Sequence, residues 1–144
     1  MSEQDKRMER IDAIVGDDEE HAGQMIGKYF EYLKANLQLP CEVTGIEDFQ
    51  WEEMYVMTSM LANEYQMLKK TQPSFRDRYQ LLDIQEQGRS PWMMFNGEDI
   101  AANVQRIGDG KKFVLGLSEL EATVKGSPIE QLLRDYAVFF CNYR

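Results

Sequence analysis

Residues 102–117, with the sequence ANVQRIGDGKKFVLGL, constrain the fold more than any other stretch of the chain. Two runs that alternate apolar and polar side chains flank a Gly-Asp-Gly tip. Such alternation turns one face of a strand toward a core, and glycines at the tip allow the chain to reverse. The stretch therefore predicts a β-hairpin. Because hairpin strands pair antiparallel, at least part of the structure should be an antiparallel sheet.

Three further segments have the composition of strands. Residues 41–49, CEVTGIEDF, combine β-branched side chains with a glycine and predict a strand that runs into a turn. Residues 77–86, DRYQLLDIQE, predict a second strand. Residues 91–100, PWMMFNGEDI, predict a third strand that turns at Asn96-Gly97.

Helical patterns occur near both ends of the chain. Between His21 and Leu37, apolar side chains recur at spacings of three and four, which predicts an amphipathic helix closed by Pro40. Residues 1–20 predict a charged, partly helical lead that breaks near VGDDEE. Shorter helices are expected at 62–70 and, as a single turn, at 118–123. The final segment, SPIEQLLRDYAVFFCNYR, predicts a helix that starts at Ser-Pro and gives way to a strand at YAVFFCNY.

Together these elements predict an α+β fold. We expect an N-terminal helical segment packed on a small antiparallel β-sheet or partly open barrel. The 144 residues suffice for one core. Residues 1–38 are expected to form a helical extension, and residues 39–144 an acidic, β-rich domain.

The charge balance excludes several classes of function. Twenty-five acidic residues against 16 Lys and Arg give a formal net charge of −9, which opposes binding to nucleic acid or anionic lipid. No apolar run approaches the roughly 18 residues of a membrane span, and MSEQDKRMER lacks the apolar stretch of a signal peptide. We therefore expect a cytoplasmic protein, with Cys41 and Cys141 as free thiols and small core residues.

Signals of catalysis are weak. The chain has one histidine, His21, in a charged segment typical of a solvated surface. It contains no G-x-S-x-G, no phosphate-binding loop and no dinucleotide glycine fingerprint. The sequence therefore predicts a protein that is not an enzyme.

Carboxylates are the richest chemical feature. The stretch TGIEDFQWEE gathers four acids around two aromatic rings, and no Lys or Arg occurs between Ala35 and Leu68. A second acidic turn, NGEDI, follows WMMF. We expect Phe49 and Trp51 to anchor the first loop while its acids face outward. The candidate metal ligands are Glu47, Asp48, Glu52, Glu53, Glu98 and Asp99.

Oxygen-rich loops of this kind suit Ca²⁺, which takes six to eight oxygen ligands in irregular geometry. The EF-hand loop D-x-[DN]-x-[DN]-G-x₅-E is absent, so a calcium site here would be of another type. The alternative is that both loops are solvated acidic surface, as in any acidic protein. The sequence alone leaves both interpretations open.

The chain resembles a small calcium-binding protein family best known from cyanobacteria. The resemblance covers roughly Leu37 to the C-terminus, and its strongest marks are TGIEDF-WEE, GEDIAA and LLxDYAVxFxNYR. It implies an acidic, largely β protein that holds Ca²⁺ on a negatively charged surface without EF-hands. Glu47, Asp48, Glu52 and Glu53 match the acidic motif. The apolar segment MYVMTSMLANEYQ departs from the polar loop expected there, as do the 36 residues that precede the match.

The resemblance predicts a calcium buffer or sensor. The departures support a second hypothesis, a protein-interaction module that presents its acidic face and N-terminal helix to a basic partner without metal. The helix also offers a surface for a homodimer.

Overall fold

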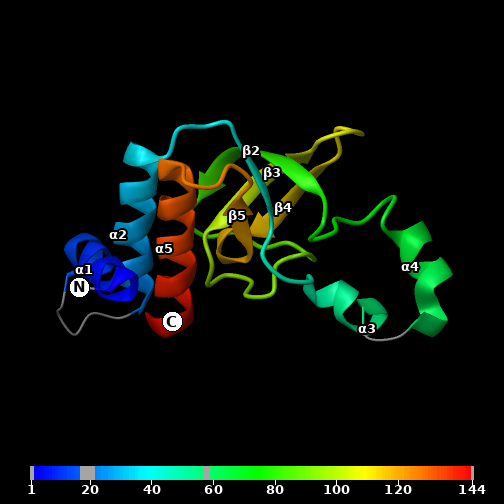
Figure 1. The fold of residues 1–144 in the computed structure, drawn as a ribbon, viewed down its shortest axis with the longest axis horizontal. Helices are drawn as coiled ribbons and strands as arrows, with labels where there is room; N and C mark the ends of the chain where they lie inside the picture. Colours follow the sequence, from blue (N-terminus) through cyan, green and yellow to red (C-terminus); the bar gives the residue numbers. More distant parts are fainter. Residues whose placement is uncertain (1, 17–21, 57–58, 144) are drawn as a thin grey trace.

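The computed structural model describes residues 2–16, 22–56 and 59–143 and has helices at both ends of a central sheet (Figure 1). The α-helices are α1 (Glu3–Val15), α2 (Ala22–Asn36), α3 (Glu53–Val56), α4 (Ala62–Leu68) and α5 (Pro128–Tyr143). The strands are β1 (Cys41–Gly45), β2 (Arg78–Gln85), β3 (Ala101–Arg106), β4 (Lys112–Gly116) and β5 (Leu120–Ala122). Three 3₁₀ helices are η1 (Gln50–Glu52), η2 (Ser59–Leu61) and η3 (Leu117–Glu119).

The five strands form one open antiparallel sheet in the order β4-β3-β2-β1-β5. The predicted hairpin is confirmed, with Ala101 opposite Gly116 and Gln105 opposite Lys112. Its tip contains two glycines with positive φ, Gly108 and Gly110. Residues other than glycine rarely adopt this backbone conformation. The predicted α+β fold is also confirmed.

Helices α1, α2 and α5 gather at one end of the molecule (Figure 1). The expected apolar stripe of α2 is buried, and its Tyr29 ring stacks on Phe139 of α5 at a centroid distance of 4.8 Å. Asp135 of α5 accepts hydrogen bonds from Arg7 and Arg10 of α1, at 3.0 and 2.7 Å. Side chains of α1, α2, α5 and the sheet belong to one continuous core. The separate extension predicted for residues 1–38 stays a prediction.

The predicted strand at the C-terminus is wrong, because α5 continues as one helix to Tyr143. Ser127 caps its start, and the Ser127 hydroxyl accepts a hydrogen bond from the Glu130 amide at 3.1 Å. The aromatic run has strand-like composition, but Tyr136, Phe139 and Phe140 share one helix face and are all buried. Burial of three rings outweighs a modest strand propensity.

The predicted third strand at 91–100 is also wrong. Residues 91–99 form successive turns, and the strand begins only at Ala101. The Asn96 side chain accepts a hydrogen bond from the Ser90 amide at 2.8 Å, and the Gly97 amide donates to the Gly88 carbonyl at 3.1 Å. These local bonds occupy groups that a strand ladder would need.

The remaining outcomes concern smaller features. Residues 118–123, expected as one helical turn, form the end of η3 followed by β5. Cys41 is buried as expected, whereas Cys141 is exposed, and both thiols are free. None of the described helices combines the length and apolarity needed to cross a bilayer. His21 lies outside the described residues.

Removing residues 1–38 should destabilise the rest of the chain. The deletion would expose the buried rings of Tyr136 and Phe139 and leave the buried carboxylate of Asp135 without Arg7 and Arg10. We expect a lower thermal midpoint by circular dichroism and self-association on size-exclusion chromatography. A fragment of residues 39–144 that melts like the full chain and stays monodisperse would instead establish the two-domain division.

Candidate functional site

The acidic loop after β1 is fixed to the protein by its backbone and its rings. Gly45 donates its amide to the Phe75 carbonyl at 3.0 Å, and a Cβ at position 45 would lie 2.6 Å from the Phe75 Cβ. Phe49 is fully buried, and the Trp51 indole donates to the Pro73 carbonyl at 2.6 Å. The anchoring role expected of Phe49 and Trp51 is confirmed.

Glu52 was expected to face outward, but its side chain is completely buried. One carboxylate oxygen accepts hydrogen bonds from the Phe75 amide at 2.8 Å and the Phe49 amide at 3.3 Å. The other accepts from the hydroxyls of Tyr65 at 2.6 Å and Ser74 at 2.7 Å. Glu52 therefore ties the acidic loop to α4 and to the segment before β2.

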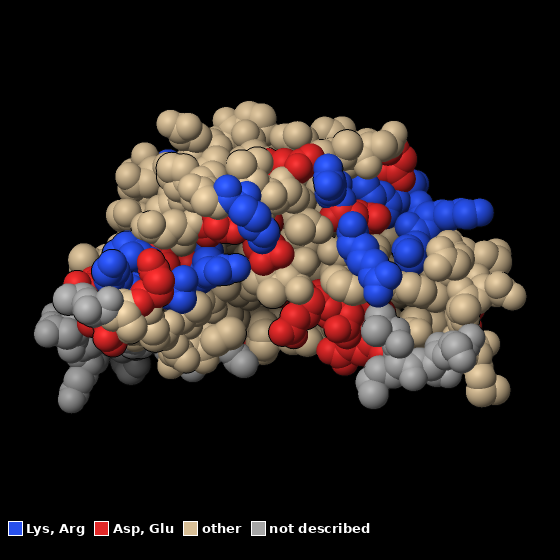
Figure 2. Space-filling model, in the orientation of Figure 1, with Lys and Arg blue, Asp and Glu red and all other residues tan. Residues whose placement is uncertain are grey.

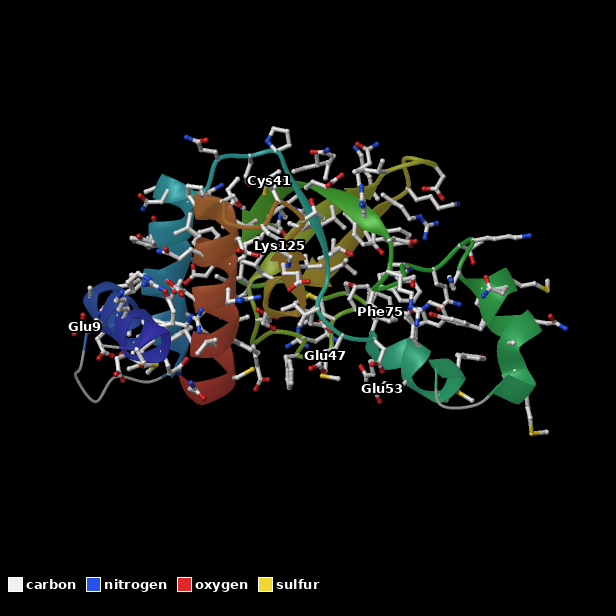
Figure 3. All side chains as sticks on the ribbon, viewed as in Figure 1. Glu9, Cys41, Glu47, Glu53, Phe75 and Lys125 are labelled. Atoms are coloured by element: carbon white, nitrogen blue, oxygen red, sulfur yellow. The ribbon has the colours of Figure 1, made fainter. Side chains whose placement is uncertain are left out.

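The other three acids of the loop line a cavity of about 700 Å³. Glu47 and Glu53 lie along the lower edge of the molecule in Figure 3, where acidic side chains also gather in the space-filling view (Figure 2). Glu119 and Glu121 line the same cavity, and Arg134 is the one basic residue that lines it in the described part of the chain. Five carboxylates thus surround one hollow.

Strand pairing brings these distant acids together. β5 pairs antiparallel with β1, with Gly45 opposite Leu120, and the Ile46 amide donates to the Glu119 carbonyl at 2.9 Å. The pairing places Glu119 and Glu121 beside the start of the acidic loop. These two acids were not among the predicted ligands, since nothing in SELEA distinguishes them from ordinary surface carboxylates.

The second acidic turn does not join the cavity. Glu98 is exposed and lies outside the cavity lining. Asp99 was expected to face a cation but is buried. Its carboxylate accepts hydrogen bonds at 2.6 Å from the hydroxyls of both Ser118 and Tyr136. Burial raises the pKa of Asp99 to about 6, against the opposing effect of these donors.

Glu119 connects the cavity to buried Asp99. A Cβ at Gly116 would lie 2.5 Å from an Asp99 oxygen and 2.7 Å from a Glu119 oxygen, so the two carboxylates approach across this glycine. Burial is the main cause that raises the pKa of Glu119 to about 7, and the nearby Asp99 charge adds to it. Glu119 therefore titrates near neutral pH.

The cavity offers hard oxygen donors, the ligand type that Ca²⁺ and Mg²⁺ take. Its carboxylates are spread around the hollow. Over the described part of the chain, no three or more Asp, Glu, His or Cys side chains cluster closely enough to hold a metal ion. A cation would therefore have to draw the side chains together, or take backbone and water oxygens as well.

No protein-family model matches the chain, and no curated protein matches it. Two solved structures resemble it. The crystal structure of Anabaena CcbP aligns with a TM-score of 0.57 and 16% identity, over 96% of this chain and 92% of that one. A calcium-binding protein in its calcium-binding form aligns with a TM-score of 0.58 and 17% identity, over 98% and 96%.

At this level of identity the likeness shows a shared fold. The resemblance to a cyanobacterial calcium-binding protein family, stated from the sequence, is therefore confirmed at the level of the fold. The alignments span nearly the whole chain, whereas the sequence motifs began only near Leu37.

Replacing Glu52 with Gln should destabilise the protein by about 2–3 kcal/mol. The NH₂ group of Gln would replace one carboxylate oxygen and could not accept the hydrogen bonds that this oxygen receives, either from the Tyr65 and Ser74 hydroxyls or from the two backbone amides. Urea unfolding would measure the loss. The matched control is Glu53→Gln at the exposed neighbouring position, expected to stay within about 0.5 kcal/mol of wild type. Equal effects of the two changes would contradict the anchoring role of Glu52.

Stability should also fall as pH rises toward neutrality. The folded-state pKa of Glu119 is raised from 4.5 to about 7, so its contribution is fully present below pH 4.5 and lost as pH rises through about 7. Urea unfolding at several pH values should show a slope that Glu119→Gln reduces, with a difference of about 1–3 kcal/mol across this window. Parallel pH profiles for the two proteins would refute the raised pKa.

Proposed function

We propose that this protein binds calcium ions at the acidic cavity, without an EF-hand. The observation that carries the proposal is the convergence of Glu47, Asp48 and Glu53 with Glu119 and Glu121 on one hollow. The proposal is supported by the fold shared with Anabaena CcbP and with a calcium-binding protein in its calcium-binding form. The same comparison favours a binding protein over an enzyme.

The proposed ligand set differs from the one expected from sequence. Glu52 already accepts four hydrogen bonds and is closed off from the cavity, so we omit it. Asp99 is omitted for the same reason, and Glu98 because it lies outside the cavity. We propose Glu47, Asp48 and Glu53 as ligands from the loop, with Glu119 and Glu121 supplied by η3 and β5.

The separation of these carboxylates has a consequence for affinity. Binding must bring like-charged carboxylates closer together, and their repulsion makes the free energy of binding less favourable. The site should therefore bind calcium more weakly than a preformed site. We expect a Kd of about 10⁻⁵ to 10⁻³ M, at the weak end of protein calcium sites. Such a site suits a buffer or a sensor of large calcium changes. It should prefer Ca²⁺ to Mg²⁺, because Mg²⁺ demands near-ideal octahedral geometry and dehydrates reluctantly.

Isothermal titration calorimetry with Ca²⁺, and with Mg²⁺ as competitor, tests this function. The paired change Asp48→Asn with Glu53→Gln should weaken calcium binding by at least about tenfold, or about 1.4 kcal/mol. Its matched control, Glu31→Gln with Glu86→Gln, removes the same charge at exposed positions outside the cavity.

The cavity variant and the control variant together distinguish binding at a defined site from diffuse attraction of counterions to the net charge. If the control pair weakens binding as much as the cavity pair, the attraction is only net charge. If wild-type protein shows no heat at millimolar calcium, the proposed function fails.

A further inference from the structure

The acidic cavity has an apolar floor that ion binding does not use. Ile46, Met94 and Phe95 line one part of it, and Ala137, Val138 and Phe140 of α5 line another. Ile46 and Met94 are 41% and 39% exposed. A hard cation takes oxygen ligands and gains nothing from these side chains. Exposed apolar surface in a concave site is typical of surfaces that bind a partner.

The size of the hollow also exceeds what one ion needs. A volume of about 700 Å³ accommodates several large side chains at once. Met94 supplies an unbranched, adaptable side chain, which is common on surfaces that accept varied apolar groups. The cavity therefore has the dimensions and chemistry to receive a row of apolar side chains.

The charge around this floor selects the occupant. Five acids line the cavity, and the nearby cations are Arg134, which also lines it, and Lys125, which forms an ion pair with Glu121 at 3.6 Å; the acids are Glu47, Asp48, Glu53, Glu119 and Glu121. An occupant must bring apolar side chains and positive charge together. A second copy does not meet this requirement with α1, α2 or α5, since these helices already contribute their apolar side chains to the core of their own chain.

We propose that the cavity is a docking site for a cationic amphipathic helix of a partner protein. Apolar side chains of the helix at spacings of three and four would enter the hollow, and its Lys or Arg side chains would face the acidic rim. This inference goes beyond calcium binding and does not depend on it. Where calcium occupies the rim acids, it would oppose docking by neutralising their charge.

The test uses full-length protein in EGTA, so that its outcome is independent of the calcium site. The probe is a fluorescein-labelled synthetic helix of about 18 Leu and Lys residues with one apolar face, followed by fluorescence anisotropy. We expect saturable binding that weakens as salt is raised. Two control peptides are a Leu and Glu version with reversed charge, and a shuffled Leu and Lys peptide without an apolar face. Both should bind at least about tenfold more weakly.

The site is located by a matched pair of double variants. Ile46→Asn with Met94→Gln should weaken peptide binding at least about tenfold, because both side chains belong to the apolar floor. Ile107→Asn with Met67→Gln makes the same chemical changes at positions that are 45% and 69% exposed and lie outside the cavity. This control pair should bind like wild type. Thermal melting checks that both variants fold.

Modification of Cys141 gives a second, independent measurement on the wild-type chain. Cys141 is exposed and lines the cavity, whereas Cys41 is buried and its pKa is raised to about 11 by burial, so maleimide should label Cys141 selectively. A bulky maleimide adduct at Cys141 should block the peptide.

The proposal is overturned if the peptide fails to saturate, if the reversed or shuffled peptide binds equally well, or if the floor variant and the adduct both bind like wild type.

Discussion

The four hydrogen bonds to the buried carboxylate of Glu52 are the interaction on which the acidic loop depends. Two come from backbone amides and two from hydroxyls, and together they join the loop to α4 and to the segment before β2. A buried carboxylate is costly unless its oxygens are satisfied, so these donors must hold their positions whenever the protein is folded. With Glu52 fixed, its neighbours Glu47, Asp48 and Glu53 are held at the edge of one cavity.

The acids of this chain therefore divide into two structural kinds that composition does not separate. Glu52 and Asp99 are enclosed and hydrogen-bonded, and they position backbone and helices. The acids that line the cavity have fewer partners and repel one another: Glu119 accepts a hydrogen bond from the Met94 amide at 3.4 Å, and Glu121 forms an ion pair with Lys125 at 3.6 Å. Glu119 stands between the two kinds, since its carboxylate lines the cavity and approaches Asp99 across Gly116. Protonation of Glu119 near neutral pH relieves part of that repulsion.

The cavity itself results from several segments that are distant in the sequence. The loop after β1, the turn at Met94 and Phe95, η3 with β5, and the helix α5 line it, and the pairing of β1 with β5 places the acidic loop beside Glu119 and Glu121. Apolar side chains of α5 line the cavity together with the acids, so the same hollow presents charge and apolar surface. This combination is the physical basis for the two ligands that we propose, a hard cation held by the acids and an amphipathic helix on the apolar surface.

Much of the secondary structure followed from local patterns. The hairpin of β3 and β4, the strands β1 and β2, the helices α2 and α4 and the capped start of α5 all matched the sequence analysis, because periodicity and turn residues act over a few positions. The errors at 91–99 and in the second half of α5 arose where local hydrogen bonds or ring burial outweighed strand propensity. The sequence by itself determined the antiparallel sheet, the charge and the acidic loop with its two anchoring rings. Only the tertiary structure decided that Glu52 and Asp99 are buried and that Glu119 and Glu121 join the cavity, because burial and strand pairing depend on contacts between residues far apart in the chain.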